Sequence, residues 1–291
     1  MKAKFVGLLS VVWFGLVQIQ SGTALTLRVS IATGSEIEVG AAQEAVVSDR
    51  WGNPIARIPE GSSLPIGAKS SLSRIGELWI EPIDEPPLIW VEGRWYRGRL
   101  QLIATSERIL AVNHVDLEEY LYSVVGSEMN SSWGIEALKS QAVAARTYAL
   151  YERENSSSSD FDLGSTDRYQ VYRGVEAETD STRVAVESTR GLVVAFEGKI
   201  AATFYSACSG GRTRAISDVW GTQPISYLTS VPDYDAGYRE CPPGIGWGHG
   251  IGLSQYGART LADARWSYNS ILQHYYPGTY LSEFDFAPDN D

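Results

Sequence analysis

The sequence has 291 residues, two cysteines and a formal net charge of −11 at pH 7. Polyanions repel so acidic a chain, which argues against a nucleic-acid partner. The length suffices for one large domain or two smaller ones with a sizeable core.

The amino terminus has the pattern of an export signal. Lys2 and Lys4 precede an apolar run over residues 5–17, and small residues at 22–24 fit a peptidase site after Ala24. We predict a signal peptide over residues 1–24 and an exported protein of the periplasm or cell wall. The alternative is an uncleaved membrane anchor, for which the run is shorter than the roughly 20 apolar residues that a spanning helix needs.

Residues 25–90 have the pattern of an all-β accessory region. In its first strand the apolar residues that alternate with polar ones are Leu25, Leu27, Val29 and Ile31. Turn-forming clusters at 51–54, 59–61 and 82–87 separate the later apolar runs. We place a domain boundary after the last, proline-rich cluster, so that the second domain spans residues 91–285.

Two helices are expected around a single glutamate. The first follows Asp116 as an acidic N-cap, and its apolar stripe is Leu117, Tyr120, Leu121, Val124 and Val125. Gly126 and Ser127 are predicted to end it. Ser132 is predicted to cap the second helix, and one face of that helix is apolar at Ile135, Leu138, Ala142, Ala145 and Ala149. Glu128 then lies in a tight connection, where burial can raise the pKa of a carboxyl.

The later elements are shorter. We predict a helix or an extended segment over 179–190, a hairpin around residues 197–198, a helix from about residue 253 and a last helix near 268–275. Glycines at alternate positions from 244 to 252 surround His249 in a loop that can approach a ligand closely. In an exported chain Cys208 and Cys241 most simply form one disulfide, and the alternative is a metal site shared with His249.

Six separated runs resemble, in the same order, the stage II sporulation protein D and amidase-enhancer family, which carries the SpoIID/LytB domain. They are LEEYL at 117–121, SEM at 127–129, EALK at 136–139, QAVAARTY at 141–148, YS at 205–206 with SGG at 209–211, and GHG at 248–250 through SQYGA at 254–258. The resemblance covers about residues 96–278. It implies an α+β fold in which a β-rich N-terminal region precedes a mixed α/β, SpoIID-like catalytic domain with a central helix pair.

The resemblance also implies a function in the cell wall. Some members of the family are lytic transglycosylases, which cleave the bond between N-acetylmuramic acid and N-acetylglucosamine in peptidoglycan without water. Others are described as non-catalytic enhancers that bind the wall or an N-acetylmuramoyl-L-alanine amidase. The expected partners are therefore peptidoglycan glycan strands and a cell-wall amidase, and we expect no nucleic acid, no cofactor and no metal.

By resemblance, Glu128 is the catalytic acid, although its chemistry alone would also suit a cap of the following helix. The matching positions expected to bind substrate are Gln141, Arg146, Ser206, Ser209, His249, Gln255 and Tyr256. If the reaction were hydrolytic, a second carboxylate would be needed.

Several of these residues have plainer interpretations. Gln141 and Arg146 can be structural, and the acidic residues open to Arg146 as ion-pair partners are Glu118, Glu119 and Asp167. His249 can be a turn residue. A serine hydrolase is disfavoured because neither Ser206 nor Ser209 lies in a nucleophile-elbow motif.

Overall fold

The computed structural model describes residues 25–71 and 73–284, so the predicted signal peptide lies outside the described residues. The strands are β1 (Thr26–Gly34), β2 (Glu36–Ala41), β3 (Ala45–Asp49), β4 (Pro54–Ile58), β5 (Ser63–Gly67), β6 (Glu77–Pro82), β7 (Leu88–Val91), β8 (Arg94–Arg97), β9 (Arg99–Ala104), β10 (Ile109–Asp116), β11 (Leu163–Gly164), β12 (Leu192–Phe196), β13 (Lys199–Ile200), β14 (Tyr205–Ser206), β15 (Leu253–Ser254) and β16 (Tyr280–Glu283). The helices are α1 (Leu117–Glu128), α2 (Ile135–Asn155), α3 (Asp180–Glu187), α4 (Ile216–Trp220), α5 (Gln255–Asp263) and α6 (Tyr268–Tyr275), with 3₁₀ turns η1 (Ser73–Ile75) and η2 (Val175–Ala177). The α+β class is confirmed.

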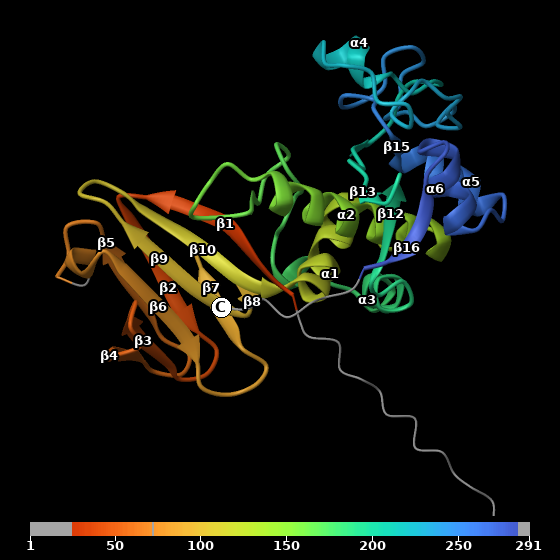
Figure 1. Cartoon of the computed structure of the whole chain (residues 1–291). Coiled ribbons are helices and arrows are strands. Elements are labelled where there is room, and N and C mark those ends of the chain that lie inside the picture. Colours follow the sequence, from red (N-terminus) through yellow and green to blue (C-terminus); the bar gives the residue numbers. More distant parts are fainter. Residues whose placement is uncertain (1–24, 72, 285–291) are drawn as a thin grey trace, which may run out of the picture.

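The N-terminal strands form two sheets that pack face to face at one end of the molecule (Figure 1). One has the strand order β11-β1-β10-β9-β6-β3-β4 and the other the order β5-β2-β7-β8. Leu27 and Val29 are fully buried, as the alternation in the sequence predicts. The predicted division after residue 90 remains a prediction, but the larger sheet continues beyond it to Asp116.

Helix α1 follows β10 without a loop. Its N-cap is Asp116, as predicted, whose side chain accepts hydrogen bonds from the backbone N–H groups of the next turn. The expectation that Gly126 and Ser127 end this helix is wrong, because α1 continues to Glu128. Gly126 is needed for packing instead. A Cβ there would lie 1.9 Å from the carbonyl oxygen of Ala177, so only glycine lets η2 approach the helix.

Helix α2 begins at Ile135 with Gly134 as its N-cap, so the expectation of a Ser132 cap is also wrong. The Ser132 backbone N–H and hydroxyl donate instead to Oδ1 of Asn130, at 2.9 and 2.8 Å. The helix is buried on all sides over residues 140–150 rather than along one face. The reason is its central position, since α1, α3, α5, α6 and β12 all pack around it.

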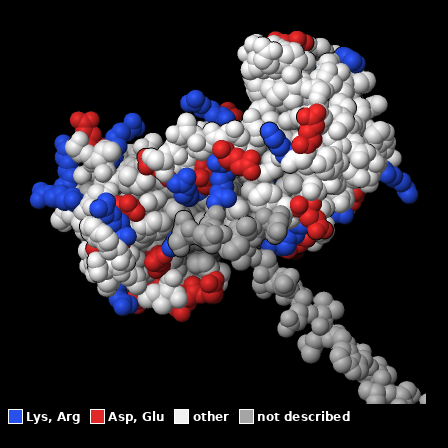
Figure 2. Space-filling model, in the orientation of Figure 1, with Lys and Arg blue, Asp and Glu red and all other residues white. Residues whose placement is uncertain are grey.

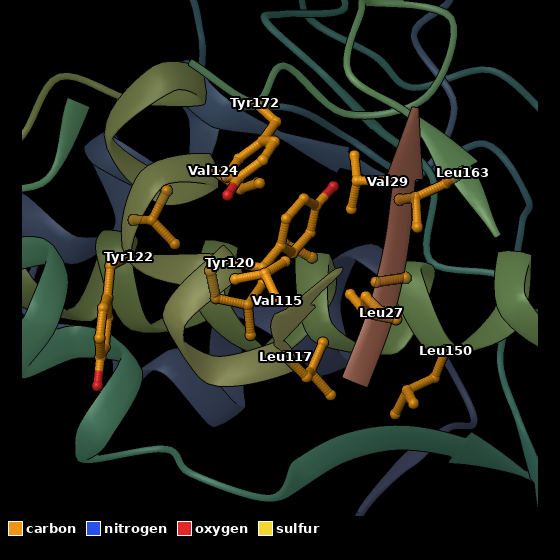
Figure 3. Packing of buried hydrophobic residues seen from close by; sticks show 14 of the residues in the cluster. Leu27, Val29, Val115, Leu117, Tyr120, Tyr122, Val124, Leu150, Leu163 and Tyr172 are labelled. Atoms are coloured by element: carbon orange, nitrogen blue, oxygen red, sulfur yellow. The ribbon is translucent and has the colours of Figure 1, made fainter. Parts of the chain in front are cut away.

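The strands and the helices share one core. Figure 3 shows Leu27 and Val29 of β1 close to Leu163, Tyr120 of α1 and Tyr172.

On the face that is visible in Figure 2, acidic and basic side chains are interspersed over the lobe of strands. Within the described residues, no helix combines the length and the apolar character needed to cross a membrane.

The C-terminal elements complete the helical half. The hairpin expected around residues 197–198 is present as β12 and β13, and β16 pairs with the other edge of β12. Residues 207–252 form a loop-rich lobe above α5 and α6 (Figure 1). Two-residue strands β14 and β15 pair in parallel at its base and bring the runs at 205–206 and 253–254 together.

Candidate active site

Glu128 is the last residue of α1, and two donors hold its carboxylate. The backbone N–H of Val171 donates to Oε1 at 2.8 Å, and the side-chain amide of Gln255 donates to Oε2 at 3.1 Å. Gln255 is the first residue of α5. Three segments that are distant in the sequence therefore converge on one carboxyl group.

Burial raises the pKa of Glu128 above its ordinary value, because the charged form is poorly solvated there. The hydrogen bonds from Val171 and Gln255 and the charge of Arg173 lower the pKa, whereas the nearby charge of Asp167 raises it; burial has the largest effect. A carboxyl with a raised pKa holds its proton closer to neutral pH. This is the property that a general acid requires.

Two hollows of about 600 and about 400 Å³ meet at Glu128. They share the lining residues Glu128, Ala207, Trp247 and Gln255. The larger is lined also by Tyr148, Asp167, Arg168, Tyr169, Val171, Phe204, Tyr205, Ser206, Trp220, Gly248 and His249. The smaller is lined also by Asn130, Trp133, Glu240, Tyr256 and Arg259. Together they form a cleft that passes Glu128 on both sides.

Four of the predicted substrate-binding residues lie along this cleft. Gln255 contacts Glu128 directly, Ser206 and His249 line the larger hollow, and Tyr256 lines the smaller one. The hydroxyl oxygen of Ser206 accepts a hydrogen bond from the Gly250 N–H at 3.1 Å. That bond ties the glycine-rich loop to the end of β14.

Burial lowers the pKa of His249, which favours the neutral form of its ring. Its Nδ1 accepts a hydrogen bond from the Ile251 N–H at 3.0 Å, so the ring proton of the neutral form lies on Nε2. The ring packs against Trp220, with 5.4 Å between centroids. His249 thus contributes an uncharged wall to the cleft.

Arg146 does not line either hollow, and its contacts fit the structural interpretation that the sequence left open beside substrate binding. Its side chain is fully buried, and its Nε and Nη2 donate to the two carboxylate oxygens of Glu118 at 2.8 and 2.7 Å. The remaining donors reach the carbonyl oxygens of Val186 and Leu192. Of the partners that the sequence left open, Glu118 is therefore the one that the fold selects.

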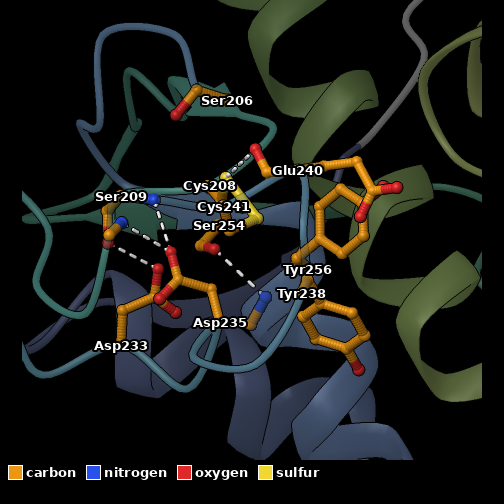
Figure 4. The surroundings of a disulfide bond; sticks show 12 residues. Ser206, Cys208, Ser209, Asp233, Asp235, Tyr238, Glu240, Cys241, Ser254 and Tyr256 are labelled. Atoms are coloured by element: carbon orange, nitrogen blue, oxygen red, sulfur yellow. Dashed lines mark hydrogen bonds between the residues drawn. A yellow bond between two sulfur atoms is a disulfide. The ribbon is translucent and has the colours of Figure 1, made fainter. Parts of the chain in front are cut away.

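Gln141 and Ser209 also do not line the two hollows, so their assignment to substrate binding stays a prediction. Gln141 is fully buried in α2, and neither polar atom of its amide has a hydrogen-bond partner within the described residues. The Ser209 hydroxyl donates to Asp233 Oδ2 at 2.5 Å, and its N–H donates to Asp235 at 2.7 Å. Ser209 therefore organises the loop lobe (Figure 4).

Sequence reasoning missed most of the aromatic wall. In the smaller hollow Trp133 packs on Tyr256 with 5.0 Å between centroids, and the Arg259 guanidinium lies 5.2 Å from the Trp133 ring centre. Of these residues, the sequence indicates only Trp133, which lies close to the SEM run and could be an apolar neighbour of Glu128. Nothing marked Trp247 or Arg259, because neither lies in a recognisable motif.

A disulfide joins Cys208 and Cys241, as the sequence predicts, with 5.8 Å between the Cα atoms (Figure 4). Each cysteine is next to a cleft residue, Ala207 in one case and Glu240 in the other. The bond therefore ties two walls of the smaller hollow together. Because it uses both thiols, neither cysteine can be the metal ligand that the alternative with His249 required.

Comparisons with known proteins show which sequences this chain is similar to. Residues 105–196, which contain Glu128 and Val171, match the family model described as SpoIID, stage II sporulation protein. An uncharacterized protein of Brachyspira hyodysenteriae is 28% identical over 282 residues, covering 68% of this chain and 77% of that protein. Stage II sporulation protein D of Bacillus subtilis is 28% identical over 265 residues, covering 60% and 77%. The amidase enhancer of Bacillus subtilis is 33% identical over 141 residues, covering 48% of this chain but 18% of that protein.

Proposed function

We propose that this chain, whose residues 105–196 match the SpoIID family model, is an exported cell-wall protein that cleaves peptidoglycan glycan strands as a lytic transglycosylase. The observation that carries the proposal is the position of Glu128 at the junction of two hollows, with a pKa raised by burial. A glycan strand is a linear polymer, and a cleft that passes its acid on both sides suits cleavage within such a strand. Export is part of the proposal.

In the proposed reaction Glu128 acts twice. It first donates its proton to the glycosidic oxygen as the bond from the muramic acid anomeric carbon breaks, which releases the leaving sugar with a hydroxyl. The resulting carboxylate then removes the proton from the muramic acid 6-hydroxyl, whose oxygen bonds to the anomeric carbon. Glu128 regains its proton, and the product ends in 1,6-anhydromuramic acid.

The residues around Glu128 have separate tasks in this scheme. The Val171 N–H and the Gln255 amide favour the carboxylate that forms in the first step, whereas burial favours the acid that begins it. The neutral His249 and the aromatic walls contact the sugar rings on either side. Asp167 and Glu240 line the two hollows and are the carboxylates to test if a hydrolytic second group is suspected.

The experiment compares the wild type with Glu128→Gln on purified, peptide-stripped glycan strands. The amide keeps the shape of the side chain and cannot supply a proton, so turnover should fall by at least about 100-fold while glycan binding persists. Glu107→Gln is the matched control, since it makes the same change at an exposed position between β9 and β10, and it should retain turnover. Equal rates for the wild type and Glu128→Gln would contradict the catalytic assignment.

A second function rests on the similarity to the amidase enhancer of Bacillus subtilis. In this alternative the chain binds the wall or a cell-wall amidase and stimulates it without cleaving glycan. The same protein preparations distinguish glycan cleavage from stimulation of an amidase. Stimulation of a purified amidase that is equal for the wild type and Glu128→Gln, with no glycan cleavage by either, would favour the enhancer.

A further inference from the structure

We propose a second glycan-binding site on the outer face of the four-stranded sheet, built by Trp90 and Trp95. The two tryptophans are directly paired across the β7–β8 hairpin, and Trp90 is paired in turn with Gly40 of β2. Gly40 is paired with Ser63 of β5. These four residues thus form one row across the sheet. They line a hollow of about 200 Å³ together with Gly61 and Ser62.

The pleat places this row away from the core. In β2 the neighbours of Gly40 are Val39 and Ala41, which are buried, and in β7 the neighbours of Trp90 are Ile89 and Val91, which are also buried. Side chains alternate between the faces, so both tryptophans stand on the opposite, outer face. Both rings are half-buried, so each offers part of its apolar surface to a ligand on this face.

The floor beside the rings is kept free of side chains. A Cβ at Gly40 would lie 2.7 Å from the Ser62 carbonyl oxygen, so a side chain at this position would displace the turn that walls the hollow. Ser63 on the far side donates its hydroxyl to Glu38 Oε1 at 2.6 Å. The hollow therefore has an aromatic wall, a bare floor and a wall of hydroxyl and carbonyl groups, all on strands or a tight turn.

The chemistry of this hollow suits a pyranose ring. Within the described residues, neither the Trp90 nor the Trp95 indole N–H has a hydrogen-bond partner, and an indole N–H can only donate. A sugar offers an apolar C–H face to a flat ring, oxygen acceptors to the two indoles, and hydroxyl donors to the Ser62 carbonyl and the Glu38 carboxylate. That combination is the usual composition of a small-ligand site, apolar with a few convergent polar groups.

Strand β8, which carries Trp95, contacts the segment that leads to Val171, and this points to the glycan of the proposed function as the ligand. The Trp95 carbonyl oxygen closely approaches Gly174, where a Cβ would lie only 2.0 Å from it. Arg97, two residues along β8 on the same face as Trp95, donates to Glu178 Oε1 at 2.8 Å. Gly174 follows Val171 by three residues, at most about 11 Å of chain. In this proposal one long glycan strand occupies both sites, and its affinity gains from avidity.

The test uses the full chain with Glu128→Gln, so that the polymer is not consumed. Binding to purified peptidoglycan sacculi is measured by co-sedimentation, and binding to a soluble oligomer of N-acetylglucosamine by calorimetry. Adding Trp90→Ala and Trp95→Ala should weaken binding to sacculi about tenfold and remove one of two binding events for the oligomer. Trp51→Ala is the matched control. Trp51 is 70% exposed in the β3–β4 turn, so its removal should leave binding to sacculi and to the oligomer unchanged.

Two further measurements make the result decisive. Trp90→Phe with Trp95→Phe keeps the stacking surface, removes the N–H donors and should give an intermediate affinity, so it carries the test if the alanine pair fails to fold. In the active chain, the alanine pair should slow cleavage of sacculi but not of short soluble strands. Unchanged binding to sacculi and to the oligomer in both double variants overturns this inference. Tryptophan-dependent binding without any cleavage by the wild type would overturn the proposed function and leave the glycan site standing.

Discussion

The surroundings of Glu128 favour the protonated form of its carboxyl group. Because burial raises its folded-state pKa above the unfolded value, the stability that Glu128 contributes is full below the unfolded pKa of about 4.5 and is lost as pH rises through the folded pKa. Ionisation of Glu128 in the folded protein therefore creates a carboxylate that the fold solvates poorly. Strain of this kind is common at active sites and is offset elsewhere in the structure.

It follows that Glu128→Gln should be more stable than the wild type at pH 7, with the difference shrinking to near zero at pH 4. The new amide can still accept from the Val171 N–H, and the Gln255 amide can rotate to accept from it. Urea unfolding of both proteins between pH 4 and pH 8 measures this. A wild type that is the more stable of the two at pH 7 would mean that the hydrogen bonds outweigh burial.

The buried pair of Arg146 and Glu118 supports a second prediction at this scale. Arg146→Met should reduce the free energy of unfolding by roughly 3–5 kcal/mol, because Glu118 is left buried without its partner. Adding Glu118→Leu should restore much of the loss, since the charge is then gone. Chemical unfolding of the single and double variants tests it. A stable Arg146→Met variant that loses glycan binding would instead return Arg146 to the substrate-binding set.

At the level of elements, the segment over residues 167–174 contacts both the N-terminal strands and the carboxyl group of Glu128. The Tyr172 hydroxyl donates to Asn113 Oδ1 at 2.8 Å, and the Asn113 amide donates to the Arg97 carbonyl oxygen at 2.8 Å. The Tyr172 ring packs against Tyr96 and Tyr120. These contacts fix the backbone N–H of Val171, which binds Glu128. The sheet region is thereby part of the active-site support.

Tyr172→Phe should therefore lower kcat by about tenfold with little change in KM, because a small displacement of a positioned group has large kinetic effects. The Val171 bond lowers the pKa of Glu128, so weakening it should also move the alkaline limb of the kcat profile to higher pH. Tyr227→Phe is the control, since it removes a comparable buried hydroxyl, the acceptor of the Ala202 N–H. If both variants behave alike, or the limb moves to lower pH, Tyr172 has no positioning role.

The sequence predicted the elements better than their ends or their roles. The 3.6-residue periodicity located α1 and α2, but not their boundaries, because Gly126 serves a close contact with η2 instead of ending a helix. The all-round burial of α2 depends on five neighbouring elements that no local pattern reveals. Gln255 was found through its motif. The Val171 donor was not, since a backbone N–H has no signature in the sequence.

On the scale of the whole molecule, one sheet joins the N-terminal strands to a strand of the helical half. Strand β1 pairs with β10 on one side and with β11, which follows α2, on the other. Leu27 of β1 packs in the same core as Leu163 of β11 and Tyr120 of α1 (Figure 3). The β-rich region is thus more than an appended module.

We therefore predict that a chain starting at residue 91 does not fold cooperatively, because it lacks the strand on which β10 and β11 depend. Circular dichroism during heating would show a broad, non-cooperative change. The chain starting at residue 25 is the control and should melt in one sharp transition. A cooperative and active fragment from residue 91 would establish the predicted boundary as a true domain division.

The central claim is that Glu128 directs the muramic acid 6-hydroxyl, and not water, to the anomeric carbon. The most direct measurement is cleavage of glycan strands in water enriched in oxygen-18, with mass spectrometry of the new chain ends. The account predicts ends of 1,6-anhydromuramic acid that carry no solvent oxygen in the wild type, and no new ends in Glu128→Gln. Reducing ends labelled with oxygen-18 would show that water attacks, and would contradict the account.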